Sequence, residues 1–222
     1  MAEELPKAES SKKPSEERKP GVAPRKTATA TPRTKSPAKG ATSKGDMNVT
    51  EALKKHFGFD SFKGDQKAII ETLLSGKDVF VLMPTGGGKS ITFQVPALAA
   101  DGVCLVITPL IALMKDQVNH LRQRGIKAYA IYAGMSHGEI LTVLDNCVYG
   151  GVTLLYVSPE RLSSELFLAR LSHMNVSFIT IDEAHCISQW GYDFRPAYRR
   201  IATVRQLLPD APILALTATA TP

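Results

Sequence analysis

Apolar and polar positions follow two distinct patterns from residue 47 onward. Short, nearly continuous apolar runs predict buried strands over residues 78–82, 102–107, 128–132, 153–157, 177–181 and 213–216. Apolar residues at helical spacing predict helices over residues 50–57, 66–74, 89–99, 110–121, 139–148, 159–170 and 196–208. We expect Thr50 to cap the first helix and Gly58 to end it. Alternating strands and helices predict an α/β fold, a parallel sheet with helices on both faces, with ligands at the carboxyl ends of the strands.

A glycine-rich segment directly follows the first predicted strand. Residues 83–90 read Met-Pro-Thr-Gly-Gly-Gly-Lys-Ser. Consecutive glycines permit the tight turn that directs several backbone N–H groups at one anion, and the helix that follows adds its positive N-terminal end. This pattern predicts a polyphosphate site, with Lys89 on the β- and γ-phosphates and Ser90 on magnesium. The residues expected to bind nucleotide here are Thr85, Gly86, Gly87, Gly88, Lys89 and Ser90.

The segment departs from the phosphate-loop template G-x-x-x-x-G-K-[ST] at its first position, where Met83 replaces glycine. The alternative is a glycine-rich turn with an incidental lysine, and a second motif argues against it. Asp182, Glu183 and His185 follow the apolar run 177–181. Two adjacent carboxylates after a buried strand suit nucleotide hydrolysis, with Asp182 on magnesium through its water shell and Glu183 orienting and deprotonating water. The alternative for this pair is an ordinary surface turn.

The first 46 residues differ in composition from the rest of the chain. They contain eleven Lys or Arg and six Asp or Glu, so they carry five of the chain's six net positive charges. They also contain six prolines, no aromatic residue and few large apolar side chains, which predicts a disordered tail. Residues 31–39 resemble a linker-histone tail, which favours loose contact with DNA phosphates. A solubilising leader without a specific role is the alternative.

The glycine-rich loop, the Asp-Glu-Ala-His box and the Thr-rich segment 216–221 together resemble motifs I, II and III of superfamily 2 helicases. The resemblance implies a RecA-like lobe and includes His185 among the expected catalytic residues. Residues 185–196 are similar to the aromatic-rich loop of RecQ-family DNA helicases. In that family the loop senses single-stranded DNA, which implies that Trp190, Phe194 and Arg195 bind DNA here. Base stacking beside a cation suits that role, and a buried aromatic plug is the alternative.

Further family motifs lie upstream. Residues 57–66 resemble the RecQ motif 0, which implies that Gln66 reads the adenine edge while Phe59, Phe62 and Lys63 flank the base. A primary amide can donate and accept at once, so glutamine suits adenine. Lys63 stands where the family usually carries arginine, which weakens the expectation of planar stacking.

Two short segments resemble motifs Ia and Ib of the same helicases. Thr108 and Pro109 belong to the first, and Ser158 and Arg161 to the second. The resemblance implies that these residues grip the DNA backbone through hydroxyl groups, helix N-termini and a guanidinium group. For Thr108 and Ser158, ordinary helix capping is the alternative.

The resemblance covers residues 47–222 and implies the first motor lobe of an ATP-dependent 3′–5′ DNA helicase that acts in recombination and repair on single-stranded DNA and duplex junctions. The implied cofactors are ATP and Mg²⁺. The second lobe, which supplies an arginine to the ATP site, is not among these residues, so we expect little or no unwinding by this chain alone. The alternative is a non-catalytic nucleotide- and DNA-binding module with a histone-like basic tail.

Cysteine spacing and hydropathy limit the classes of protein to which this sequence can belong. Cys104, Cys147 and Cys186 are far apart and form no C-x-x-C pair, so we expect a reducing compartment and no zinc site in this chain. His185 lies outside any H-E-x-x-H motif, which also disfavours zinc. The start of the sequence shows no secretory signal, and no apolar run is long enough to span a bilayer. Together with a reducing compartment, the resemblance to DNA helicases implies a cytoplasmic, nucleoid-associated protein in a bacterium, or a nuclear one in a eukaryote.

Overall fold

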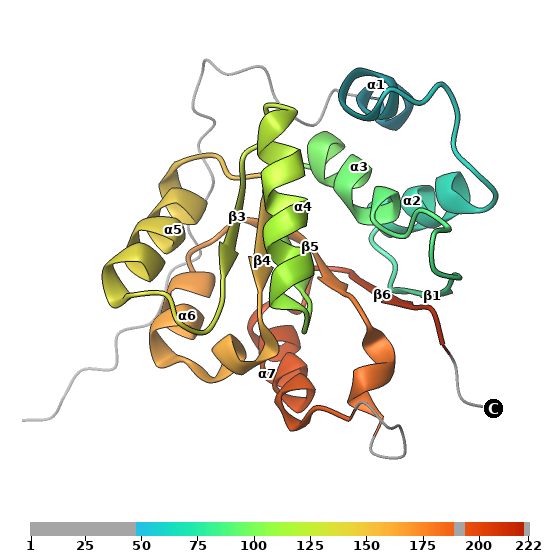
Figure 1. The fold of residues 1–222 in the computed structure, drawn as a ribbon. Coiled ribbons are helices and arrows are strands. Elements are labelled where there is room, and N and C mark those ends of the chain that lie inside the picture. The colour runs from blue at the N-terminus through green and yellow to red at the C-terminus, as the bar shows by residue number, and fades with distance from the viewer. Residues whose placement is uncertain (1–47, 189–193, 220–222) are drawn as a thin grey trace, which may run out of the picture. The chain divides into compact units, whose positions relative to one another are not determined.

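The computed structural model describes residues 48–188 and 194–219. Six parallel strands form one sheet in the order β1-β6-β5-β2-β4-β3 (Figure 1). The strands are β1 (Val79–Leu82), β2 (Val103–Ile107), β3 (Ala128–Ile131), β4 (Leu154–Val157), β5 (Val176–Ile181) and β6 (Ile213–Thr217). The predicted RecA-like parallel sheet is therefore confirmed. Strand β6 lies between β1 and β5, and so separates the strand that precedes the glycine-rich loop from the strand that precedes Asp182.

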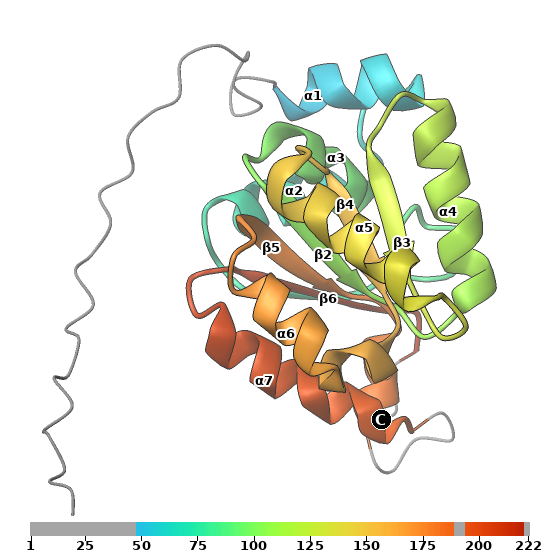
Figure 2. The ribbon, with the colours of Figure 1, turned by 90° about the vertical axis from the view of Figure 1, so that its left-hand side faces the viewer.

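Helices cover both faces of the sheet. The α-helices are α1 (Val49–Ala52), α2 (Gln66–Leu74), α3 (Ile91–Ala99), α4 (Ile111–Gln123), α5 (His137–Tyr149), α6 (Glu165–Leu171) and α7 (Ile201–Leu207). Shorter helical segments are η2 (Leu53–Phe57), η3 (Pro159–Ser163), η4 (Ala184–Ile187) and η5 (Pro196–Arg200). One hydrophobic core joins the sheet to α1, η2 and α2 to α4, and a second joins the opposite face to α5, α6 and α7 (Figure 2).

Strand burial follows from this two-layer covering. Every residue of β2 and β4 is buried, as expected of parallel strands covered on both faces. Strand β1 lies at the sheet edge, where Val81 faces the core while Phe80 and Leu82 are exposed. The apolar runs predicted from the sequence thus correspond to all six strands, with complete burial at β2 and β4.

The observed elements depart from the predictions at three helices. The cap of α1 is Asn48, whose Oδ1 accepts a hydrogen bond from the backbone N–H of Thr50 at 2.9 Å, so the prediction that Thr50 is the cap is wrong. The helix predicted over residues 159–170 is divided at Ser164 into η3 and α6. The helix predicted over residues 196–208 begins as the 3₁₀ segment η5 before α7. Gly58 ends the first helical segment as predicted, with φ of 75°.

The three cysteines, Cys104, Cys147 and Cys186, are all buried. Burial raises the pKa of the Cys147 thiol to about 12 and raises that of Cys104 further still. Within the described ranges, none of the helices is both long enough and apolar enough to cross a membrane.

Candidate functional site

The glycine-rich loop joins the carboxyl end of β1 to the N-terminus of α3 and needs glycine for two different reasons. Gly86 and Gly88 have φ values of 80° and 78°, a region that L side chains rarely adopt. A Cβ on Gly87 would lie 2.8 Å from Cγ of Met83, too close for any side chain. Met83, which replaces the first glycine of the template, therefore packs against Gly87. A side chain at position 87 would collide with it.

Gln66 links the motif 0 segment to this loop. Its side-chain Nε2 donates to the carbonyl oxygens of Gly87 and Gly88, each at 3.2 Å, and its Oε1 accepts from the backbone N–H of Lys63 at 2.9 Å. The residue is only 3% exposed, although it begins helix α2. The predicted base-reading residue is thus held at the first turn of α2, against the phosphate loop.

A cavity of about 210 Å³ lies beside Gln66. Its lining residues are Leu53, Phe59, Ser61, Lys63, Gln66, Gly86, Gly88 and Ile91. The ammonium group of Lys63 lies 5.9 Å from the centre of the Phe59 ring, while Phe62 packs against the core. A partly apolar cavity next to a phosphate loop has the character of a nucleotide-base pocket. Sequence reasoning missed Leu53, Ser61 and Ile91, because nothing distinguishes them from ordinary helix or loop residues.

Asp182 lies at the carboxyl end of β5 in a nearly buried position, 7% exposed. The hydroxyl of Thr108 donates to its Oδ2 at 3.3 Å, and the backbone N–H of Glu183 donates to its Oδ1 at 3.0 Å. Burial and the neighbouring Glu183 carboxylate raise the pKa of Asp182, while these hydrogen bonds and Lys89 oppose that shift. A bound divalent cation would stabilise the ionised form that burial disfavours.

The Glu183 carboxylate lies between Lys89 of the glycine-rich loop and His185 of the acidic box. One carboxylate oxygen lies 3.9 Å from the ammonium nitrogen of Lys89, and the other lies 3.3 Å from Nδ1 of His185. The backbone of Glu183 has φ of 50°, the one positive value among the described non-glycine residues. Left-handed backbone at such a residue costs free energy and occurs preferentially at functional sites.

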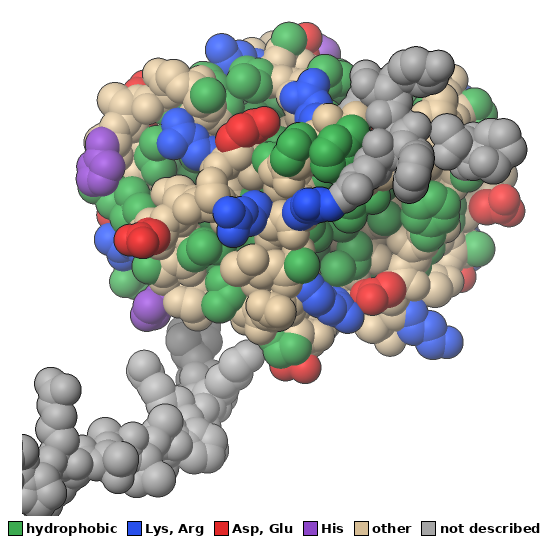
Figure 3. Space-filling view, turned by 90° about the horizontal axis from the view of Figure 1, so that it is seen from below, with side chains coloured by type: hydrophobic (Ala, Val, Ile, Leu, Met, Phe, Trp, Pro, Cys, Tyr) green, Lys and Arg blue, Asp and Glu red, His purple; other side chains and the backbone are tan. Residues whose placement is uncertain are grey.

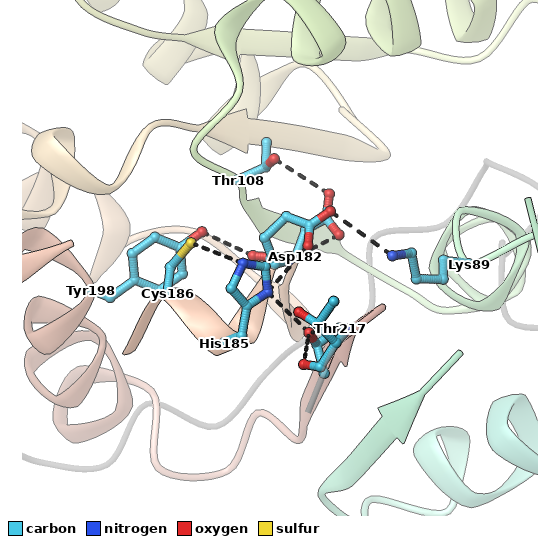
Figure 4. Close-up of polar contacts among 9 residues, drawn as sticks. Lys89, Thr108, Asp182, His185, Cys186, Tyr198 and Thr217 are labelled. Atoms are coloured by element: carbon cyan, nitrogen blue, oxygen red, sulfur yellow. Dashed lines mark hydrogen bonds and ion pairs between the residues drawn. The ribbon is translucent and has the colours of Figure 1, made fainter. Parts of the chain in front are cut away.

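His185 in turn connects this box to β6. Its Nδ1 lies 3.0 Å from Oγ1 of Thr217, and that hydroxyl donates to the carbonyl oxygen of Thr219. Because the Thr217 proton is engaged there, Nδ1 of His185 is the donor to Thr217. Lys89, Glu183, His185 and Thr217 therefore form one continuous series of polar contacts along the carboxyl ends of β1, β5 and β6 (Figure 4).

The chemistry of the donor set suits Mg²⁺. Asp182 offers carboxylate oxygens, and Ser90 offers a hydroxyl at the start of α3, and hard oxygen ligands are those that Mg²⁺ prefers. The described parts of the chain contain no cluster of three or more His, Cys, Asp or Glu residues arranged to hold a metal ion.

The residues predicted to bind DNA occupy varied environments. Thr108 and Ser158 are 2% and 1% exposed, while Pro109 is half-buried. Arg161 donates from Nε and Nη2 to the carbonyl oxygen of Tyr132, at 3.3 and 2.8 Å. Their roles stay predictions, and burial favours positioning roles for Thr108 and Ser158, since Thr108 already bonds Asp182.

The aromatic-rich segment is described only in part, because Trp190 lies outside the described residues. Phe194 and Arg195 are half-buried, with the Arg199 guanidinium 5.8 Å from the Phe194 ring centre. The backbone N–H of Arg195 donates to the carbonyl oxygen of Cys186 at 2.9 Å. The buried hydroxyl of Tyr198 donates to the backbone carbonyl of Asp182 at 2.9 Å. Tyr198, which no motif identified, therefore ties the end of this segment to the acidic box.

The surface below the sheet, as Figure 1 is drawn, is shown in Figure 3. Lys and Arg side chains are interspersed there with acidic and hydrophobic ones, rather than gathered in a single basic field. The site is thus defined by specific side chains, and not by overall positive charge.

A buried polar network connects α3 to α4 behind the loop. The Tyr156 hydroxyl accepts from Nε2 of Gln94 at 3.1 Å and donates to Oε1 of Gln117 at 2.9 Å. Burial raises the pKa of the Tyr156 phenol well above its usual value. Nothing in the pattern of the sequence marks these residues as a set, because they come from three separate elements.

Tyr156→Phe is expected to lower the free energy of unfolding by about 1–3 kcal/mol, because it leaves the buried Gln94 and the half-buried Gln117 with only their 3.4 Å contact to each other. Denaturant unfolding monitored by circular dichroism measures the change. Tyr149→Phe is the matched control, since Tyr149 is 80% exposed, and it should shift stability by less than about 0.5 kcal/mol. Equal stability of the two variants would contradict a structural role for the network.

Fold and site together define a phosphate-loop nucleotide-binding domain. The family model of the DEAD/DEAH box helicases matches residues 63–222, and the chain belongs to this family.

Among curated proteins, the chain is similar to RecQ-type ATP-dependent DNA helicases. It is 48% identical over 168 residues to that of Haemophilus influenzae, and 47% identical over 172 residues to that of Bacillus subtilis. These alignments cover 76% and 77% of this chain but 27% and 29% of the two relatives. The chain thus spans a little over a quarter of their length.

Solved structures support the fold. The helicase MrfA bound to DNA and AMPPNP superimposes with a TM-score of 0.64 at 18% identity, over 82% of this chain and 27% of that one. A hypothetical ATP-dependent RNA helicase from Sulfolobus tokodaii gives a TM-score of 0.59 at 26% identity, over 77% and 50% of the two chains.

Proposed function

We propose that residues 47–222 form the ATP-binding motor lobe of a RecQ-type 3′–5′ DNA helicase, and that residues 1–46 form a basic tail. The observation that carries this proposal is the series of contacts from Lys89 through Glu183 and His185 to Thr217. It joins the phosphate loop, the acidic box and β6, and the 48% identity to RecQ relatives agrees with it.

ATP is the proposed substrate and Mg²⁺ the proposed cofactor. The base would enter the cavity beside Gln66, whose lining includes Phe59 and Lys63 but not Phe62, which packs against the core. Residues 85–90 would hold the phosphates through backbone N–H groups and the Lys89 ammonium. Ser90 and Asp182 would hold Mg²⁺, which supplies charge neutralisation between the β- and γ-phosphates.

Glu183 is the proposed general base. Its carboxylate would accept a proton from the water that attacks the γ-phosphorus, while Lys89 stabilises the negative charge on the transferred group. In this structure Lys89 faces Glu183, so phosphate binding draws Lys89 toward the nucleotide and leaves Glu183 held by His185. A change in the position of His185 would then affect the segment that follows β6 through the contact between His185 and Thr217.

DNA is the proposed polymer substrate, as single strands and duplex junctions in recombination and repair. Trp190, Phe194 and Arg195 would contact the strand and affect the acidic box through Tyr198. Motifs Ia and Ib would position the backbone, with Thr108, Pro109, Ser158 and Arg161 as the residues concerned. In a bacterium such a protein acts in the cytoplasm at the nucleoid, and in a eukaryote in the nucleus. The tail would add salt-sensitive contact with DNA phosphates.

Gln66→Ala is expected to lower the preference for ATP over GTP about 10-fold or more, because it removes the amide that would exchange its bonds to Lys63, Gly87 and Gly88 for a paired donor and acceptor on the adenine edge. Competition of unlabelled ATP and GTP against a fluorescent ATP analogue measures the preference. Gln123→Ala, on the exposed end of α4, is the control and should behave as wild type. A wild-type protein that binds ATP and GTP equally would contradict the assignment of Gln66.

A further inference from the structure

A groove that no motif covers runs along the β3 edge of the sheet. It lies where α4 and α5 flank β3 (Figures 1 and 2). One hollow of about 330 Å³ is lined by Lys115, Val118, Asn119, Arg122, Tyr129, Ala130, Tyr132, Met135 and Val143. A second hollow of about 270 Å³ shares Arg122 and Tyr129 with the first and is further lined by Gly125, Ile126, Lys127 and Ala128. The two therefore form one continuous depression, here called the β3-edge groove.

The cations of the β3-edge groove are held in place by aromatic rings. The Lys115 ammonium lies 4.5 Å from the centre of the Tyr132 ring, and the Arg122 guanidinium carbon lies 4.6 Å from that of Tyr129. Nε of Arg122 also donates to the carbonyl oxygen of Ala128 at 2.8 Å. Cation–π contact and this hydrogen bond restrict both side chains, so less entropy is lost when they meet an anion.

The lining of the β3-edge groove, as far as the structure describes it, contains no acidic side chain. Asp116 is exposed on α4 next to Lys115 but is not part of the lining. The Glu139 carboxylate, at the start of α5, is occupied as a helix cap, accepting from the N–H and the hydroxyl of Ser136. The groove thus presents Lys115, Arg122 and Lys127 without a compensating charge in its wall.

The positive positions are arranged along a line. Residues 115, 119 and 122 are spaced at four and three positions, which places them on one face of α4. Lys115 and Arg122 are separated by about 10 Å along the helix. Asn119 lies between them as a neutral donor and acceptor.

One end of the β3-edge groove meets the proposed DNA face. Tyr132 lies under Lys115 and, through its backbone carbonyl, accepts two hydrogen bonds from Arg161 of motif Ib. A strand that contacts motif Ib therefore has a continuous positive path along the groove.

We propose that the β3-edge groove binds the sugar–phosphate backbone of single-stranded DNA, as a second contact beyond motifs Ia and Ib. The contact is independent of base sequence, because cations cover the faces of Tyr129 and Tyr132 on the groove side. The proposal rests on the proposed function at one point, which is that motif Ib contacts DNA at one end of the groove.

Binding of fluorescein-labelled oligothymidylates to the full chain, followed by anisotropy over a salt series, tests the proposal. For a 24-nucleotide strand, Lys115→Gln/Arg122→Gln should lower the slope of log K against log salt by about 1.4, since each neutralised phosphate of a single strand contributes about 0.7. For an 8-nucleotide strand, the double substitution should change this slope less. Lys77→Gln, an exposed lysine before β1, is the control and should leave the slope unchanged.

Lys115→Glu/Asn119→Glu provides a second variant that keeps the Arg122 packing intact, and thermal unfolding confirms that each variant is folded. The same slope for wild type and both folded double variants would overturn the groove contact while leaving the proposed function in place. Binding of polyglutamate but not of oligothymidylate at the groove would overturn it in favour of an acidic protein partner. Failure of every strand to bind, with ATP binding retained, would overturn the groove together with the DNA part of the proposed function.

Discussion

Lys89→Ala is expected to weaken the binding of MgATP about 10- to 150-fold, the loss that corresponds to removal of charged hydrogen bonds worth about 1.5–3 kcal/mol. The side chain is 15% exposed and lies 3.9 Å from Glu183, so it is already positioned at the loop. Its removal takes away the mobile cation for the β- and γ-phosphates without changing the turn that the glycines form. Titration with a fluorescent ATP analogue measures the dissociation constant.

Lys77→Ala is the matched control, because Lys77 is an exposed lysine at the opposite end of β1. It should bind MgATP as the wild type does. If Lys89→Ala bound MgATP with wild-type affinity, the glycine-rich segment would be a turn with an incidental lysine, the alternative that the sequence alone left open.

Glu183→Gln is expected to slow ATP hydrolysis about 10²- to 10⁴-fold while ATP binding is retained or strengthened. Glutamine cannot accept the proton of the attacking water, so the chemical step is lost. Binding should not weaken, because the substitution also removes the carboxylate that faces Lys89 in competition with the phosphates. Single-turnover hydrolysis of radiolabelled ATP, with protein in excess, measures the rate even if the chain turns over slowly.

The same assay separates the motor lobe from the non-catalytic alternative. Asp145→Asn, a carboxylate on α5 that pairs with Arg170, is the control and should hydrolyse ATP at the wild-type rate. A wild-type rate no faster than that of Glu183→Gln, with ATP binding intact, would favour a nucleotide- and DNA-binding module that does not turn over.

Apolar patterning was sufficient to predict the sheet and its helices, because strands buried on both faces must be apolar throughout. The predicted range of α2 agrees with the structure at both ends, residues 66–74. Patterning failed at Ser164 and at the start of α7, where the chain turns through short 3₁₀ segments without losing its apolar spacing. It also predicted Thr50 as the cap where the structure has Asn48, because both residue types cap helices and patterning does not separate them.

Sequence motifs predicted some residues of the candidate site but not the contacts that join them. Lys89, Asp182 and Glu183 belong to motifs that lie at strand ends, and parallel topology brings those ends to one edge. Thr217 lies in the Thr-rich segment that resembles motif III, but its contact with His185, like that of Tyr198 with Asp182, depends on tertiary geometry that motif spacing does not give. Gln66 was predicted to read a base, and its bonds to the carbonyls of Gly87 and Gly88 add a link that spacing could not predict.

The measurement that tests the central claim most directly is calorimetric titration of the full chain with ATP, in the presence and absence of Mg²⁺. The account predicts saturable binding of one ATP per chain, strengthened by Mg²⁺ and displaced more weakly by GTP. Absence of ATP binding by the folded chain, or binding that neither Mg²⁺ nor the identity of the base affects, would contradict it.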